Sequence, residues 1–155
     1  YEDGSVYEGE KLNELRHGRG KFFYADGGMY DGEWRQGRMH GYGHLYYPSG
    51  EVAYEGEWRE DKFNGKGIVY NENPIELKAE FDYTNFQTLC DHWKKYEGDF
   101  KDDNKEGIGT IFLSNGDRFT GRFLNDEVHG QGTYFRRDGR VITGKWENNI
   151  IVYTY

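Results

Sequence analysis

The chain has 155 residues, a formal net charge of -8, 18% aromatic residues and 23 glycines. The acidic excess disfavours binding to nucleic acid and to anionic membranes, because both attract clustered Lys and Arg. The single cysteine, Cys90, excludes an internal disulfide framework and Cys-rich zinc sites. It fits a reducing compartment, so we expect a cytoplasmic protein.

In chain order, the main signal is a repeat with a period near 23 residues. A motif of the form ring-acid-glycine, relaxed to FTG and ITG near the C-terminus, begins at Tyr7, Tyr30, Tyr54, Tyr96, Phe119 and Ile142. Paired glycines follow the same schedule in HGRG (His17), HGYG (His40), NGKG (Asn64), EGIG (Glu106) and HGQG (His129). Because residues 1–7 align with residues 24–30, we expect the chain to open inside the end of an earlier repeat.

Each repeat reads as two short strands joined by a turn. Residues 30–34 alternate ring or glycine with acid, the period-2 pattern of a strand with two different faces. A turn at Gln36-Gly37 follows, residues 41–45 return as a second strand, and residues 48–50 lead to the next repeat. A glycine on the ring-bearing face leaves room for a neighbouring ring to lie flat over the backbone. We therefore predict an all-β fold, an elongated single-layer antiparallel sheet of stacked β-hairpin repeats (a solenoid).

The predicted array spans residues 1–155, with repeats at 7–29, 30–53, 54–70, 96–118 and 119–141 and a partial repeat at 142–155. The 42-residue spacing before Tyr96 marks an insertion at about 71–95. Its rings and leucines at Phe86, Leu89, Trp93 and Tyr96 follow 3, 4 and 3 spacings, which fit a short amphipathic helix from Thr84 or Asn85. Such a helix would cover part of the sheet; a solvated loop is the alternative.

The motif Y-E-G-E-W followed by H-G-x-G and D-G at this period resembles the MORN (membrane occupation and recognition nexus) repeat family. The resemblance covers the chain except the insertion. It implies a non-catalytic scaffold that docks a helix or extended peptide of a partner protein, by family resemblance in a cytoskeletal or ciliary assembly. Alternatives are a membrane module that binds anionic lipid or phosphoinositide, and the regulatory segment of a larger enzyme.

Catalytic, metal and cofactor sites are not expected. His17, His40 and His129 occupy one repeat position about 10 Å apart, too far to share a zinc ion, so we interpret them as hydrogen-bonding turn residues. No phosphate-binding loop motif occurs. The recurring carboxylates (Glu8, Glu10, Asp31, Glu33, Glu55, Glu57, Glu97 and Asp99) follow the solvent-facing alternation and predict a solvated stripe. Cys90 near His92 is interpreted as a chance pairing.

The aromatic face is the predicted partner-binding surface, because a single-layer sheet has no second layer to cover it. Its residues are Tyr7, Tyr30, Trp34, Tyr54, Trp58, Tyr96, Phe100, Phe119, Phe123 and Trp146. For the lipid alternative the candidate residues are Arg118, Arg122, Arg136, Arg137, Arg140 and Lys145. The apolar last strand, residues 150–155, also predicts self-association through the sheet ends.

Overall fold

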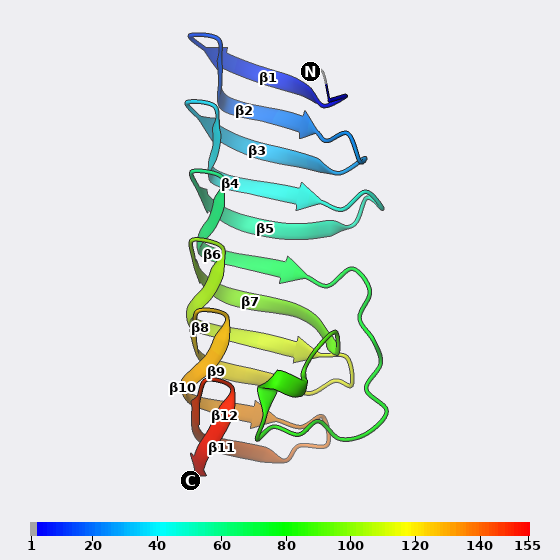
Figure 1. The fold of residues 1–155 in the computed structure, drawn as a ribbon, viewed down its shortest axis with the longest axis vertical. Helices are drawn as coiled ribbons and strands as arrows, with labels where there is room; N and C mark the ends of the chain where they lie inside the picture. The colour runs from blue at the N-terminus through cyan, green and yellow to red at the C-terminus, as the bar shows by residue number, and fades with distance from the viewer. Residues whose placement is uncertain (1–2) are drawn as a thin grey trace.

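Residues 3–155, which the computed structural model describes, form one antiparallel sheet of 12 strands whose order in the sheet is their order in the chain (Figure 1). The strands are β1 (Val6–Leu12), β2 (Leu15–Phe23), β3 (Met29–Arg35), β4 (Arg38–Tyr46), β5 (Val52–Arg59), β6 (Lys62–Tyr70), β7 (Trp93–Lys101), β8 (Asn104–Leu113), β9 (Arg118–Leu124), β10 (Glu127–Phe135), β11 (Val141–Glu147) and β12 (Ile150–Thr154). The predicted all-β, single-layer sheet of stacked hairpins is confirmed. Residues 1 and 2, part of the alignment with an earlier repeat, lie outside the described residues.

Each hairpin closes on a two-residue turn in which both residues have positive φ. The pairs are Asn13-Glu14, Gln36-Gly37, Glu60-Asp61, Asp102-Asp103, Asn125-Asp126 and Asn148-Asn149. This is the type I′ geometry, whose twist matches the flanking strands. From the second hairpin to the third, Asp61 donates its N–H to the Met39 carbonyl oxygen (2.9 Å) and accepts the Met39 N–H at Oδ1 (2.8 Å). Asp103, Asp126 and Asn149 make the same two bonds to Phe63, Lys105 and Val128, so the turns are tied from hairpin to hairpin.

The turn end of each hairpin bends toward one face of the sheet. In the second repeat the pairing register shifts between Gly32 and Trp34, and the facing Gly41 has a φ of 93°. Such a β-bulge bends a hairpin and leaves a backbone N–H without a ladder partner. The Glu33 carboxylate accepts this N–H, that of Tyr42. Glu10, Glu57 and Asp99 accept the equivalent N–H groups of Arg19, Lys66 and Ile108. The sequence predicts only a solvated stripe for these carboxylates. In the structure they also stabilise the bulges by accepting backbone N–H groups.

Rings fill the concave face that the bent hairpins create. The Tyr30 ring lies over Gly43, so close that a Cβ on Gly43 would lie 2.1 Å from the Tyr30 Oη. Edge-on contacts join Tyr30 to Trp34 of its own repeat and to Trp58 of the next, with centroid distances of 5.1 Å in both pairs. Equivalent contacts between neighbouring repeats are Tyr7 with Trp34, Tyr54 with Phe100, Tyr96 with Phe123, and Phe119 with Trp146. The predicted fit of ring and glycine is confirmed.

The insertion leaves the sheet after β6, crosses the C-terminal half of the concave face and returns as β7 (Figure 1). Its helix is a single 3-10 turn, η1 (Phe86–Thr88), with the Asn85 side chain accepting the Gln87 N–H at 2.9 Å. The prediction of an amphipathic helix is therefore wrong, apart from this single turn. Cys90 has a φ of 46°, which ends the helical path, and Trp93 already begins β7. The segment instead bridges to β12, where Asn85 pairs with Ile150.

Candidate docking groove

Three columns of side chains line the concave face beside the central rings. The turn-side column comprises Arg16, Met39, Phe63, Lys105, Val128 and Ile151; the middle column comprises Phe22, Leu45, Val69, Ile111 and Tyr134; the far column comprises Tyr24, Tyr47, Asn71, Leu113 and Arg136. The turn-side column takes one residue from each of the six hairpins and the other two columns take one from each of the first five, so the members of a column sit in equivalent positions. Differences in burial along a column therefore report what lies over it.

The middle and far columns change from half-buried to buried where the insertion begins. Phe22, Leu45 and Val69 are half-buried, whereas Ile111 and Tyr134 are 4% and 0% exposed. In the far column, Tyr24 and Tyr47 are half-buried and Leu113 is 1% exposed. The half-buried members over the first three repeats, apart from Asn71, are called the open groove below: Arg16, Phe22, Tyr24, Met39, Leu45, Tyr47, Phe63 and Val69.

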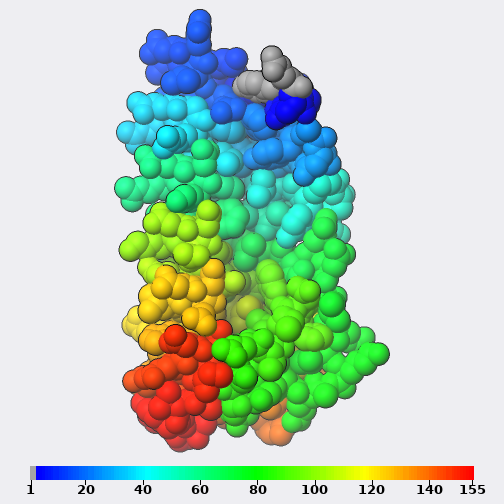
Figure 2. Space-filling view, in the orientation of Figure 1, coloured from blue at the N-terminus to red at the C-terminus, as the bar shows by residue number. Residues whose placement is uncertain are grey.

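The insertion provides the cover over the last repeats. Phe81 and Phe86 are 2% and 5% exposed. The Phe86 ring lies 4.8 Å from Phe119 and 6.0 Å from Trp146, and the Phe81 ring lies 5.8 Å from Tyr134, all between centroids. Figure 2 shows the insertion, in green, lying against the C-terminal hairpins in the lower half of the molecule, beside the row of hairpin turns. The prediction that the insertion covers part of the sheet is confirmed.

The insertion is also fixed by main-chain hydrogen bonds. The Phe86 N–H donates to the Asn149 carbonyl oxygen at 2.8 Å, and the Ile151 N–H donates to the Thr84 carbonyl oxygen at 2.8 Å. The indole N–H of Trp146 donates to the Tyr83 carbonyl oxygen at 2.7 Å. The segment is therefore held on the concave face by one isolated β-bridge and these main-chain hydrogen bonds.

The ten rings predicted to contact a partner are brought together on this face, but the accessibility expected for them is wrong. Tyr30, Trp34, Tyr54, Trp58, Tyr96, Phe100, Phe119, Phe123 and Trp146 are between 0% and 6% exposed, and Tyr7 is half-buried. The bent turn ends cover them: Phe63, for example, stacks on Tyr54 with centroids 3.8 Å apart. These rings form the core, and the open groove is the accessible apolar surface beside them. The columns stand one residue before and five and seven residues after the repeated histidine position, and this spacing does not reveal the bend, so sequence reasoning missed the columns.

Two cations stand in the turn-side column among these rings. The Arg16 guanidinium carbon lies 4.8 Å from the Trp34 ring centroid and 5.2 Å from that of Phe22, and Arg16 Nη2 donates to the Gly37 carbonyl oxygen at 3.0 Å. Lys105 Nζ lies 5.5 Å from the Tyr96 centroid. Burial lowers the pKa of Lys105, and the Asp126 charge opposes this shift. Lys105 is thus a cation at a position where four of the other five repeats carry Met, Phe, Val or Ile.

Replacing Lys105 with methionine is expected to raise the melting temperature by a few degrees at pH 7. Because the folded-state pKa of Lys105 is lowered, the unfolded chain binds more protons between that pKa and the ordinary value of about 10.4, so wild-type stability rises with pH there. The gain from Lys105→Met should therefore shrink as the pH rises toward 10. Thermal melts of both proteins across this range measure it, and a gain independent of pH would contradict the assignment.

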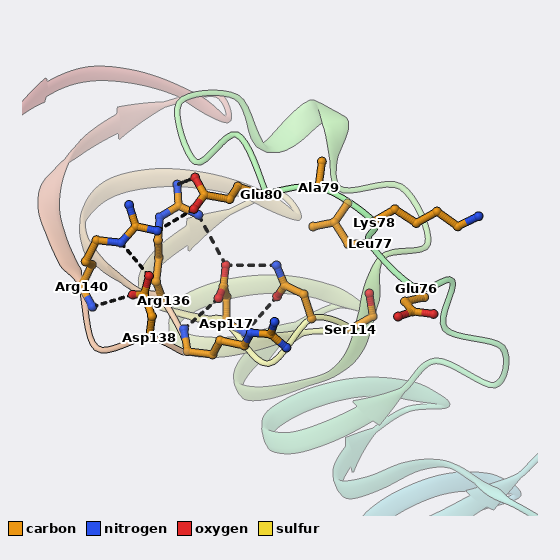
Figure 3. Close-up of a pocket in the computed structure, with 12 residues that line it drawn as sticks. Glu76, Leu77, Lys78, Ala79, Glu80, Ser114, Asp117, Arg136, Asp138 and Arg140 are labelled. Atoms are coloured by element: carbon orange, nitrogen blue, oxygen red, sulfur yellow. Dashed lines mark hydrogen bonds and ion pairs between the residues drawn. The ribbon is translucent and has the colours of Figure 1, made fainter.

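A polar pocket lies where the start of the insertion meets the β8–β9 and β10–β11 turns (Figure 3). Asp117, 4% exposed, accepts the Tyr134 hydroxyl at 2.5 Å and the Arg137 N–H at 2.9 Å. Arg136 Nη1 lies 3.7 Å from Asp117 Oδ2, and Arg140 Nη2 lies 2.5 Å from Glu80 Oε1. Burial, followed by the bond to Asp117, raises the pKa of Tyr134. The Arg140–Glu80 pair fastens the insertion to the β10–β11 turn, the Arg136–Asp117 pair joins the β10–β11 and β8–β9 turns, and the charges of each pair balance.

The six basic residues of the lipid alternative are divided between two places. Arg136, Arg137 and Arg140 belong to the pocket turns. Arg118, Arg122 and Lys145 point to the opposite, convex face, where Arg118 stacks on Phe135 at 4.0 Å and Lys145 Nζ lies 3.8 Å from Glu147 Oε1. The structure therefore does not gather them into one basic patch.

The hydrogen-bonding role predicted for the repeated histidine position is confirmed at His17 and His129. His17 and His129 accept at Nδ1 the N–H groups of Gln36 and Asn148, at 3.4 and 3.1 Å. Asn64 takes the same role toward the N–H of Asp102.

Cys90 is exposed, and His92 Nδ1 lies 2.9 Å from the Ile75 carbonyl oxygen. Among residues 3–155 no group of three or more His, Cys, Asp or Glu side chains is arranged to hold a metal ion. The same part of the chain contains no helix with the length and apolar character of a membrane span.

The fold and its partly covered concave face define a hairpin-repeat solenoid, a class in which stacked units build an extended binding surface. The sequence profile described as MORN repeat matches residues 7–29, 30–52, 54–70, 96–118 and 119–139, more than half of the chain. This chain belongs to the MORN repeat family. MORN repeats are non-catalytic and generally mediate protein or membrane interactions. No curated protein matches the chain.

Proposed function

We propose that this chain is a non-catalytic docking scaffold that holds an extended segment of a partner protein in the open groove. The observation that carries the proposal is the burial contrast along the middle column. Leu45 and Val69 are half-buried, while Ile111 and Tyr134 are buried where the insertion lies over them. The chain thus already binds one extended segment on the concave face, and Leu45 and Val69 remain half-buried at equivalent positions.

An extended partner fits this surface better than a long helix. The insertion follows the face through a β-bridge and one 3-10 turn, which shows the path that the bent hairpins accommodate. Apolar contacts on such a face supply affinity, and the rigid repeat array limits the entropy cost of ordering. We retain a cytoskeletal or ciliary assembly in the cytoplasm as a proposal that rests on the family resemblance.

Leu45→Asp is expected to abolish this docking, because a buried carboxylate in the apolar groove loses its hydration without a partner charge. Peptides of about a dozen residues, selected from a displayed random library on the wild-type chain, serve as ligands. Their affinity should fall more than tenfold for Leu45→Asp, or about 1.4 kcal/mol and above.

The matched control is Ile108→Asp, on the convex face, where Ile108 is 51% exposed. The milder Leu45→Gln protects the test if Leu45→Asp unfolds. Circular dichroism melts establish that each variant is folded. Selected peptides that bind both Leu45 variants as tightly as wild type, or that lose affinity equally with Ile108→Asp, would overturn the proposed site.

A further inference from the structure

The hairpin turns of the second and third repeats carry four basic side chains in pairs. Arg35 lies directly opposite Arg38, and Arg59 lies directly opposite Lys62. All four side chains are exposed. Like charges directly opposite on a hairpin are destabilising, so these pairs work against the fold in isolation. The same positions in the other four hairpins hold Leu12 and Leu15, Lys101 and Asn104, Leu124 and Glu127, and Glu147 and Ile150. The like-charged pairs are thus confined to two adjacent turns.

These basic side chains point away from the open groove, because neighbouring residues of a strand point to opposite faces. Their sequence neighbours on the concave face are Trp34, Met39, Trp58 and Phe63. The three arginines line a separate hollow of about 400 Å³, whose walls are Arg35, Gln36, Arg38, His40, Arg59 and Glu60. Three arginines and one glutamate give this hollow a net charge of +2 with the histidine neutral, in a chain whose net charge is -8.

Little within the chain neutralises the charge of the hollow. Arg38 Nη1 lies 3.9 Å from Glu60 Oε2, and both side chains are more than half exposed. An exposed ion pair of this length is weak. Within residues 3–155, Arg35 and Arg59 make no ion pair and no side-chain hydrogen bond. Their guanidinium groups are therefore available to an external anion.

His40 differs from the other two histidines at its repeat position. His17 and His129 each accept the N–H of a turn residue at Nδ1. In the part of the chain that the structure describes, the His40 ring makes no such bond, and it lines the hollow instead. Because a neutral imidazole carries one N–H donor and one acceptor, His40 adds a hydrogen-bond donor to the three arginines.

The hollow is fixed in place and surrounded by acids. Asp61 joins the third turn to Met39 beside the second through two hydrogen bonds, of 2.9 and 2.8 Å, so the arginines of the two turns are held at a set spacing. The preceding turn carries Glu14, and the following turn carries Asp102 and Asp103, all exposed. The positive charge therefore ends within one turn on each side. A site of this size suits a single compact anion, whereas an anionic membrane surface would also meet the flanking carboxylates.

We propose that this hollow binds a phosphorylated side chain of a partner protein. A phosphate monoester carries a charge of about −1.5 to −2 near neutral pH and three acceptor oxygens, so one group neutralises the hollow. Arginine guanidinium groups donate paired N–H bonds to such oxygens. A carboxylate offers one charge and two oxygens, and leaves part of the repulsion between Arg35 and Arg38 in place. The site goes beyond the proposed function and does not depend on the open groove.

The test uses a peptide library with one fixed phosphoserine between random residues, enriched on the wild-type chain. Enriched sequences are then synthesised with phosphoserine and with serine, and their affinities are measured by fluorescence anisotropy. We expect the phosphorylated forms to bind at least about tenfold more tightly than the serine forms, and to lose at least about tenfold in affinity for Arg35→Ala/Arg59→Ala.

The matched control is Arg122→Ala/Arg137→Ala, which removes two arginines exposed elsewhere on the molecule and should change the affinity by less than about twofold. Circular dichroism melts establish that each variant is folded, and Arg35→Gln/Arg59→Gln replaces the alanine variant if that one unfolds. Leu45→Asp should leave the phosphopeptide affinity unchanged. The hollow and the open groove are therefore tested separately, and either can fail alone.

Equal affinity for phosphorylated and unphosphorylated peptides would overturn the proposal, as would an unchanged affinity for Arg35→Ala/Arg59→Ala. Vesicles of phosphatidylcholine and phosphatidylserine probe the competing source of phosphate. If the chain sediments with these vesicles through Arg35 and Arg59 and binds no phosphopeptide, the cluster serves a membrane surface and the phosphorylated partner is wrong.

Discussion

Replacing Gly43 with alanine is expected to destabilise the fold by about 3 kcal/mol, because overpacking a close-packed core costs about 1–3 kcal/mol and sometimes more. The added Cβ would lie 2.1 Å from the Tyr30 Oη and 2.4 Å from Cζ. Tyr30 cannot retreat, since it is 0% exposed and stands between two tryptophans at 5.1 Å. Urea denaturation measures the change in unfolding free energy.

The sign of this effect is informative by itself. Where the backbone permits it, a glycine-to-alanine change stabilises a protein by about 0.4–1 kcal/mol through the unfolded state. In a Tyr30→Ala background the obstacle is gone, so Gly43→Ala should cost far less there than in the wild type. Equal costs in the two backgrounds would show that the ring does not set the requirement for glycine.

Deleting residues 74–92 is expected to lower the unfolding free energy by at least about 3 kcal/mol, since truncating one buried phenylalanine already costs about 3–5 kcal/mol. The deletion removes 19 residues and so restores the 23-residue spacing of the neighbouring repeats, which keeps the β6–β7 connection feasible. It uncovers Ile111, Leu113 and Tyr134. A shorter loop returns little, because loop-closure entropy changes slowly with length. Thermal and urea melts report the loss.

Phe86→Ala removes this ring and leaves the rest of the insertion in place. It should lower the unfolding free energy by about 3 kcal/mol, the cost of truncating one buried phenylalanine. Its control is Gln87→Ala, one residue away and exposed on the same 3-10 turn. A melting midpoint unchanged by both the deletion and Phe86→Ala would mean that the insertion does not cover the sheet in solution.

The repeat unit could be predicted from the sequence because its determinants are local. The Tyr30-x-Gly32 alternation, the second glycine pair and the turn at Gln36-Gly37 each specify one piece of a hairpin, and repetition specifies how the pieces stack. The polar role of His17 and His129 followed from the same argument.

The bend in the hairpins could not be predicted, because it depends on conformation and not on residue type. Gly41 and Gly43 are identical in sequence, yet Gly41 takes positive φ at the bulge while Gly43 lies flat beneath Tyr30. This bend buries the rings that the sequence analysis expected to be accessible. The role of Glu33 depends on it as well, since its carboxylate accepts a backbone N–H that the bulge exposes.

The path of the insertion could not be predicted from the sequence either. Spacings of 3 and 4 between rings favoured a helix, but contacts with residues far along the chain decide the conformation. Phe86 is buried by Phe119 and Trp146, and Asn85 bridges to Ile150, all more than thirty residues away. The open groove emerges only from comparing equivalent positions with and without this cover.

Hydroxyl-radical footprinting of the free chain tests the covered and open halves of the concave face most directly. The oxidation rate of each side chain is divided by its rate in the unfolded chain. Tyr24, Met39 and Phe63 of the open groove should react faster than Leu113, Val128 and Tyr134 beneath the insertion. After deletion of residues 74–92 the second set should rise to the level of the first. Equal protection of both sets in the intact chain would contradict the division of the concave face into a covered half and an open docking half.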